Sequence, residues 1–169
     1  TGTMRINSQG HLEIGNIDTV DLVKDFGTPL WVIDEQGFRQ NCRNIKQAFS
    51  RLGQSTVIYA SKTLYTSAIC KIVAQEGLGL DVVSGGELYT AIKAGFPVEK
   101  IYFHGNNKSG EEITMAVKAG IGRVVIDNFY ELKLLDQICK ELGKEQDILL
   151  RITPGVEAHT HEYIKTGQI

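Results

Sequence analysis

Residues 79–104, GLDVVSGGELYTAIKAGFPVEKIYFH, contain one complete strand–helix–strand unit. Leu80 to Val83 is a short apolar run, which is typical of a strand buried on both faces. Apolar residues and a terminating glycine then follow at helical spacing, at Leu88, Ala91, Ile92 and Gly95. Ile101 to His104 is the next apolar run. This alternation predicts two parallel strands joined by a helix.

The same alternation extends to both sides of this unit. Four further apolar runs are expected to be strands: Pro29–Asp34, Thr56–Ala60, Arg123–Ile126 and Ile148–Ile152. Helical faces separate them, formed by Phe38, Cys42, Ile45, Phe49 and Leu52, by Ala68, Ile69, Ile72 and Val73, by Ile113, Ala116 and Val117, and by Phe129, Leu132, Leu135 and Cys139. About six strands alternating with five helices predict an α/β fold with a parallel sheet.

Two architectures fit this alternation: an open, doubly wound sheet and an incomplete (β/α)8 barrel. A complete barrel needs eight strands and about 250 residues, whereas this chain has 169. The open sheet would carry a Gly-x-Gly-x-x-Gly fingerprint after its first strand, and this sequence has none there. We therefore predict an incomplete TIM-type barrel. Its unpaired strand edges would favour aggregation of the isolated chain.

The N-terminal residues do not follow the strand–helix alternation. Arg5–Asn7 and His11–Ile14 indicate a small hairpin, and Asp18–Phe26 indicates a short helix. We therefore predict an N-terminal extension at residues 1–26, followed by the truncated barrel at residues 27–169.

The composition is that of an ordinary globular protein, with 42% hydrophobic and 22% charged residues. A net charge of −2 gives no indication of a nucleic-acid partner. No apolar run is long enough for a membrane span. The three cysteines, Cys42, Cys70 and Cys139, lack metal-ligand spacing, so we expect no metal. Buried, reduced cysteines fit a cytoplasmic protein.

Several strand–helix junctions carry signals for helix N-termini. Ser84-x-x-Glu87 and Ser109-x-x-Glu112 both fit the capping box. Asp34 and Asn128 are also expected to cap helices. Helix capping and a catalytic role account equally well for the presence of Ser84 and Glu87.

Lys62 is the first candidate for chemistry, because it closes the strand Thr56–Ala60. A lysine in such a place is expected to point into an interior or a cleft. Burial disfavours the charged ammonium and makes the amine more nucleophilic. Lysine amines form Schiff bases with carbonyl compounds, including pyridoxal phosphate (PLP). The alternative is a structural lysine whose long side chain reaches water.

Three more polar residues lie at or near strand ends: Asp81, His104 and Arg151. The carboxyl ends of barrel strands meet at one rim, where the active sites of such barrels form. We expect Arg151 to lie inside the last strand, where its charge requires a partner such as a carboxylate. Asn106, Asn107 and Lys108 are expected to line the same rim.

Two histidines near the C-terminus, His159 and His161, are interpreted as solvated loop residues. No third ligand has the spacing of a metal site.

Several segments together resemble PLP-dependent decarboxylases of the alanine-racemase fold type and, within them, the diaminopimelate decarboxylases. The resemblance extends over nearly the whole chain from about Met4. The segments that carry it are Tyr59–Lys62, Gly79–Leu88, His104–Ser109, Arg151–Val156 and Glu157–Gly167.

This resemblance implies PLP as the cofactor and Lys62 as its Schiff-base lysine. It implies that Asp81 lies close to that lysine and that His104 and Arg151 belong to the cofactor environment. The implied reaction is decarboxylation of meso-2,6-diaminopimelate to L-lysine by a cytoplasmic homodimer, with an amino acid as the small-molecule substrate and no membrane partner. In such enzymes the N-terminal segment packs with a C-terminal β-domain.

The sequence also departs from the resembled family. It has no glycine-rich phosphate loop, and the family's ring-stacking histidine and the cysteine supplied across the dimer would lie beyond Ile169. We therefore expect the isolated chain to be inactive.

Four other interpretations stay open at this stage. An ornithine, arginine or carboxynorspermidine decarboxylase would share the fold, although His104–Asn107 and Glu157–Gly167 favour diaminopimelate. Alanine racemases differ at Thr63–Tyr65, where they usually have Ala-Asn-Ala-Tyr after the lysine. A non-catalytic PLP-binding carrier would need no second domain but would not explain the N-terminal extension. An inert structural fragment is the last alternative.

Overall fold

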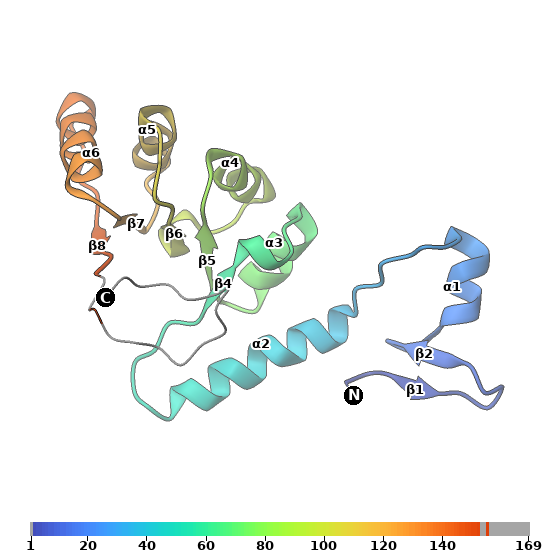
Figure 1. Ribbon diagram of the computed structural model, residues 1–169. Coiled ribbons are helices and arrows are strands. Elements are labelled where there is room, and N and C mark those ends of the chain that lie inside the picture. Colours follow the sequence, from blue (N-terminus) through green and yellow to red (C-terminus); the bar gives the residue numbers. More distant parts are fainter. Residues whose placement is uncertain (1, 153–154, 156–169) are drawn as a thin grey trace. The chain divides into compact units, whose positions relative to one another are not determined.

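The computed structural model describes residues 2–152 and residue 155 (Figure 1). These residues form two compact units. The first contains residues up to 58 together with 72–78, and the second contains residues 59–71 and those from 79 onward. In the described part of the chain, no helix is long and apolar enough to cross a membrane.

The first unit begins with a small antiparallel sheet. Strands β1 (Arg5–Ile6), β2 (Leu12–Ile14) and β3 (Ile17–Asp18) pair in chain order. Helix α1 (Thr19–Phe26) follows, and the Asp18 side chain caps it by accepting a hydrogen bond from the Val20 N–H. The predicted hairpin and short helix are confirmed, whereas β3 was not predicted from the sequence.

Helix α2 (Glu35–Ser50) begins where predicted, because the Asp34 carboxylate accepts a hydrogen bond from the Gly37 N–H at 2.9 Å. Its surface is polar apart from a few side chains, and Cys42 is its only buried residue. The predicted apolar face is therefore mostly exposed: Ile45 is 47% exposed and Phe49 49% exposed.

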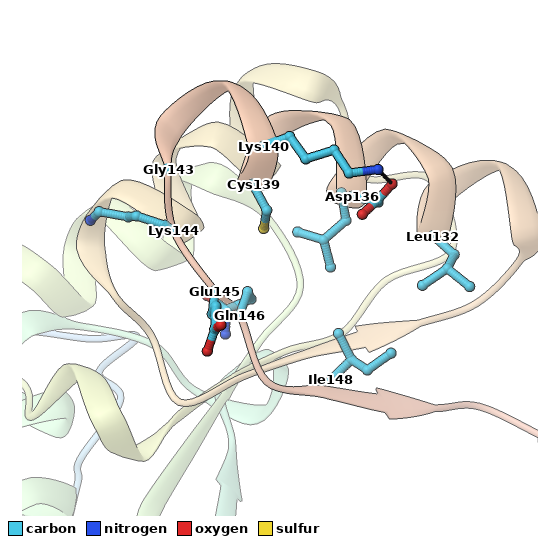
Figure 2. Close-up of a pocket in the computed structure, with 10 residues that line it drawn as sticks. Leu132, Asp136, Cys139, Lys140, Gly143, Lys144, Glu145, Gln146 and Ile148 are labelled. Atoms are coloured by element: carbon cyan, nitrogen blue, oxygen red, sulfur yellow. Dashed lines mark hydrogen bonds and ion pairs between the residues drawn. The ribbon is translucent and has the colours of Figure 1, made fainter.

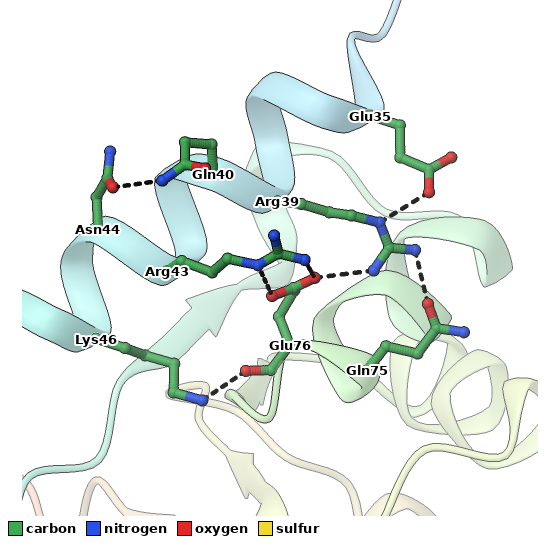
Figure 3. Close-up of polar contacts among 8 residues, drawn as sticks. All are labelled: Glu35, Arg39, Gln40, Arg43, Asn44, Lys46, Gln75 and Glu76. Atoms are coloured by element: carbon green, nitrogen blue, oxygen red, sulfur yellow. Dashed lines mark hydrogen bonds and ion pairs between the residues drawn. The ribbon is translucent and has the colours of Figure 1, made fainter.

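A charged cluster connects α2 to Glu76 (Figure 3). Arg43 binds the Glu76 carboxylate through two nitrogens, at 2.8 and 2.9 Å, and Arg39 binds it at 3.0 Å. Lys46 donates to the Glu76 backbone carbonyl at 2.6 Å. The paired guanidinium geometry is the strong form of this interaction. Arg43, with Arg39 second, lowers the pKa of Glu76 to about 2, from an ordinary value of 4.5.

This cluster should make stability depend on pH in acid. Because the pKa of Glu76 is lower in the folded state, its contribution is fully present above pH 4.5 and is lost as the pH falls toward 2. Urea unfolding midpoints measured from pH 6 to pH 3 should therefore fall less in Glu76→Gln than in the unaltered protein. The exposed Glu111 supplies a control, since Glu111→Gln should leave the pH profile unchanged. Identical profiles for Glu76→Gln and the unaltered protein would contradict the prediction.

The strand predicted at Pro29–Asp34 is wrong. These residues form no strand ladder in the described part of the chain, and Trp31 is 97% exposed. A β-branched run has strand propensity, but an extended segment becomes a strand only when its backbone groups find a pairing partner. The predicted total of six strands in the main sheet is therefore corrected to five among the described residues.

The main sheet has the topology predicted for a barrel segment. Its strands are β4 (Ile58–Ala60), β5 (Gly79–Val82), β6 (Ile101–Phe103), β7 (Arg123–Ile126) and β8 (Ile148–Leu150). They lie in sequence order, and the pairs from β5 to β8 are parallel. An order that follows the sequence has no central switch point, so the doubly wound alternative is excluded.

The elements between these strands are 3₁₀ turn η1 (Ser61–Thr63), helix α3 (Ser67–Gln75), helix α4 (Gly85–Ala94), 3₁₀ turn η2 (Val98–Lys100), helix α5 (Gly110–Ala119) and helix α6 (Phe129–Leu142). Helices α4, α5 and α6 lie side by side on one side of the sheet (Figure 1). The core between them is fully buried and consists of Leu80, Val82, Leu88, Ala91, Ile101, Phe103, Ile113, Ala116 and Val124.

The predicted helix ends are largely confirmed. Gly95 ends α4 in the left-handed conformation, as predicted, and Gly120 and Gly143 end α5 and α6 in the same conformation, which glycine adopts without steric cost. Ser109 and Glu112 form the complete capping box, and Asn128 caps α6.

The cysteines are free, as predicted. Cys42 and Cys70 are buried, whereas Cys139 is partly exposed. Burial raises the pKa of all three thiols, which makes them poor nucleophiles.

Candidate active site

Three of the predicted site residues gather at the carboxyl ends of neighbouring strands. Lys62 lies in the turn η1 directly after β4, Asp81 is the third residue of β5, and His104 directly follows β6. Parallel strands present their carboxyl ends at one edge of the sheet, so the alternation of elements brings these side chains to the same rim.

The structure corrects one premise about Lys62. The residue is exposed rather than buried, because the chain turns immediately after Ala60 and carries Lys62 beyond the sheet. Its amine makes no hydrogen bond to any residue that the structure describes. The amine is thus accessible to a ligand, but its reactivity cannot be ascribed to burial.

Asp81 is the electrostatic centre of this group. Its Oδ1 atom is buried and has no hydrogen-bond partner among the described residues. His104 Nε2 lies 3.8 Å from Oδ1, which is an ionic contact beyond hydrogen-bond range. Burial raises the pKa of Asp81; His104 and Lys62 both act to lower it. The carboxylate is thus placed to stabilise a nearby cation.

Glu87 has a structural role that its sequence motif only partly predicted. Ser84 accepts a hydrogen bond from the Glu87 N–H, as in a capping box, but the Glu87 carboxylate accepts from the Val83 N–H at 2.6 Å. The Tyr65 hydroxyl donates to the Glu87 backbone carbonyl. Tyr65 was missed from the sequence, since nothing in its local pattern indicates a contact 22 residues away.

Arg151 occupies a different place from the one predicted. It follows the end of β8 rather than lying inside the strand, and its side chain is 53% exposed. The predicted carboxylate partner is present, because Arg151 Nη1 lies 3.1 Å from Asp127 Oδ1. Asp127 follows β7 and was not singled out from the sequence. This pair extends the polar rim to β7 and β8.

The sequence resemblance implies a PLP-dependent enzyme. On that expectation, replacing Arg151 by alanine should weaken turnover of the complete protein by roughly tenfold, because small displacements of a rim cost catalytic rate. Covalent attachment of PLP, the cofactor that the resemblance implies, should persist, since Arg151 has no primary amine to form a Schiff base. Steady-state kinetics and trapping of the cofactor with borohydride would measure both effects. Arg123→Ala is a matched control, because Arg123 pairs with Asp147 at 3.7 Å, near the amino end of β7. Equal activities of the two variants would contradict a rim role for Arg151.

The loop after His104 divides into exposed and buried residues. Asn106 and Asn107 are exposed, as a rim position requires. Lys108 was predicted to line the rim, and this is wrong: its side chain is only 1% exposed and packs inward. His159 and His161 lie outside the described residues. The described residues contain no group of side chains suited to a metal.

A pocket of about 540 Å³ lies between α6 and β8 (Figure 2). Its walls include Leu132, Leu135, Cys139 and Ile148. It extends to the Gly143–Gln146 segment, which leads into the amino end of β8. It therefore lies away from the strand ends that carry Lys62, Asp81 and His104, and it contains none of them.

Comparison with known families decides the class. The family described as "Pyridoxal-dependent decarboxylase, pyridoxal binding domain" matches residues 35–169. The chain belongs to this decarboxylase family. The incomplete (β/α) barrel is the fold of its pyridoxal-binding domain, and the family's cofactor is pyridoxal phosphate.

Curated relatives within the family are diaminopimelate decarboxylases. The chain is 56% identical over 168 residues to the one from Bacillus subtilis (strain 168), with 99% of this chain and 38% of the relative covered. It is 58% identical, with the same coverage, to the one from Halalkalibacterium halodurans. This decarboxylase chain thus spans a little over a third of the length of the relatives it matches.

Solved structures agree with this placement. Diaminopimelate decarboxylase from M. jannaschii, solved in complex with L-lysine, has a TM-score of 0.88 and 38% identity. The match covers 96% of this chain and 38% of that one. A lysine/ornithine decarboxylase from Vibrio vulnificus has a TM-score of 0.70 and 26% identity, covering 80% of this chain and 35% of that one.

The residues at the rim fit the family's cofactor. Lys62 offers an accessible primary amine at the same rim as Asp81, whose Oδ1 atom is buried without a hydrogen-bond partner in the described chain. A carboxylate whose oxygen is buried without a hydrogen bond is stabilised by a nearby positive charge. The described part of this decarboxylase chain therefore supplies an amine and its counter-charge.

Proposed function

We propose that the complete protein containing this chain is a diaminopimelate decarboxylase, which converts meso-2,6-diaminopimelate to L-lysine and carbon dioxide. The observation that carries the proposal is the identity of 55–58% to three enzymes of that name over 99% of this chain. The geometry of the rim supports it, because an accessible lysine and a carboxylate with one buried oxygen both lie at the edge where barrel enzymes perform chemistry.

Lys62 is the residue that would hold the cofactor, through its Nζ atom. Pyridoxal phosphate, when bound, supplies an electron sink for the carbanion formed as carbon dioxide leaves. Asp81 would keep a cationic nitrogen protonated, since one oxygen of its carboxylate is buried and His104 Nε2 lies 3.8 Å from that oxygen. Lys62 Nζ can donate or accept a proton once it is free. His104 would line the same face of the site.

Release of carbon dioxide by the complete, PLP-loaded protein tests the proposal. Turnover of meso-diaminopimelate should exceed that of L-ornithine and L-arginine at equal concentration. Preference for ornithine would favour the second candidate, a basic amino-acid decarboxylase such as the V. vulnificus structure represents. Binding of PLP without turnover of any of the three would favour a carrier protein.

The isolated chain of 169 residues should show no measurable decarboxylation, because it spans only 38% of the enzyme from B. subtilis. Turnover by this chain alone would contradict the proposal that further residues complete the site.

A homodimer is part of the same proposal. Phe129 and Tyr130 are 83% and 76% exposed at the start of α6, and exposed aromatic pairs of this kind support an interface. Light scattering of the complete protein would measure its mass, and a monomer would contradict this part of the proposal.

A further inference from the structure

Lys108 is a buried charge that the mechanism above does not use. It lies four residues after His104, and its side chain is 1% exposed. An ammonium removed from water costs several kcal/mol unless charged and hydrogen-bonding partners compensate it. Lysine is therefore rarely fully buried. The groups that Lys108 contacts indicate its role.

The partners of Lys108 come from three different elements. Its Nζ atom donates to the carbonyl of Gly105 at 2.7 Å, in its own loop, and to that of Val125 in β7 at 2.8 Å. It lies 2.7 Å from Oε1 of Glu131, in the first turn of α6, whose side chain is 3% exposed. The Phe103 ring is 5.8 Å away. Lys108 therefore ties the loop after β6 to the next strand and helix.

Close contacts with β5 and the residue after it constrain the loop that follows β6. Gly105 has a φ of +112°, and a Cβ atom added there would lie 3.2 Å from the Val83 carbonyl oxygen, after β5. The His104 N–H donates to the Val82 carbonyl at 2.8 Å. Residues 104 and 105 are thus fixed between β5 on one side and the Lys108–Glu131 pair on the other.

These contacts of the loop bear on the position of His104, the first residue after β6. The histidine depends on the loop backbone for its place 3.8 Å from Asp81 Oδ1. Without Lys108, the Gly105 carbonyl would lose its hydrogen bond from the ammonium, and the loop would lose its tie to β7 and α6.

We propose that Lys108 and Glu131 form a positioning pair that holds His104 beside Asp81 and thereby sets the affinity of the rim for pyridoxal phosphate. The inference rests on the function proposed above. The pair acts through the loop and does not touch the cofactor. The competing explanation is a pair that contributes to stability alone.

The test uses the complete protein with both charges removed, in Lys108→Met combined with Glu131→Leu. Replacing a buried ion pair by apolar side chains of similar volume is often neutral for stability, whereas removing one partner alone leaves a costly buried charge. The matched control is Lys140→Met with Asp136→Leu, which removes an exposed pair from the same helix α6.

Three measurements separate positioning from stability: urea unfolding, hydrogen exchange at residues 104–107, and titration with pyridoxal phosphate. The double variant should stay folded but unfold at a somewhat lower urea concentration, because the Gly105 and Val125 carbonyls lose their donor. It should exchange about tenfold faster in that loop and bind PLP about tenfold more weakly. The control pair should change none of the three. Unchanged PLP affinity in the folded double variant would overturn the proposal.

A second variant covers the case in which the double variant does not fold. Gly105→Ala disturbs the same loop from the β5 side and leaves no buried charge unpaired. It should also weaken PLP binding, and unchanged affinity would overturn the proposal. If the unaltered protein binds no PLP, the proposed function fails. The exchange rates of residues 104–107 would then still decide whether the pair orders the loop.

Discussion

Replacing Lys62 by alanine in the complete protein should abolish covalent attachment of the cofactor and remove turnover. Lys62 is an exposed primary amine at the rim that carries Asp81, and alanine offers no nucleophile. Loss of its proton transfer alone is expected to cost about 10²–10⁴-fold in rate. Loss of the anchor adds to this, so the residual activity should fall below detection.

The measurement is reduction with borohydride in the presence of PLP, followed by peptide mass spectrometry and an assay of carbon dioxide release. The unaltered protein should carry a pyridoxyl group on the peptide containing Lys62. Lys71→Ala is the matched control, because Lys71 is exposed in α3 and makes no contact with the rim carboxylates. A pyridoxyl group found at another lysine, with activity retained in Lys62→Ala, would show that the assignment is wrong.

Replacing Phe103 by alanine should cause the largest loss of stability. Phe103 lies in the middle of the sheet, in β6, and its side chain is 0% exposed. Removing a buried phenylalanine ring costs about 3–5 kcal/mol, from lost burial and from the cavity left behind. Phe103 also faces the Lys108 ammonium, so the substitution removes a contact of the buried ion pair as well.

Urea unfolding of the complete protein would measure this change, and the expected loss is a large part of the 5–15 kcal/mol typical of a folded protein. Leu52→Ala supplies the comparison, because Leu52 is 78% exposed after the end of α2. It should change the free energy of unfolding by less than about 0.5 kcal/mol. Equal losses for the two variants would contradict the placement of the core.

Strand β6 ends in a core residue, and the residue directly after it belongs to the rim. The ring of Phe103 belongs to the core, while the next residue, His104, belongs to the rim. The Lys108–Glu131 pair lies between these two environments, because it is buried like the core and bonded to the loop that carries His104. A stability defect at Phe103 is therefore expected to weaken cofactor binding also, which is why the tests above measure unfolding and binding separately.

Features that depend on local backbone chemistry could be predicted from the amino-acid sequence. The apolar periodicity predicted the strands β5–β8 and the helices between them, since side-chain period distinguishes the two structures. The helix signals at Asp34, Ser109 and Asn128 were correct, because a cap satisfies backbone N–H groups only a few residues away. The strand order, and with it the meeting of Lys62, Asp81 and His104 at one rim, followed from the same alternation.

Which groups are buried and which are paired depended on contacts between residues distant in the chain, and these could not be predicted from local sequence. Pro29–Asp34 has the composition of a strand but forms no ladder with any residue that the structure describes, since pairing depends on a partner distant in sequence. Lys62 and Lys108 both follow apolar strands, yet the first is exposed and the second is enclosed by Glu131 and two carbonyls. Local sequence cannot separate the two cases, because the cost of burying an ammonium depends on partners that folding alone brings together.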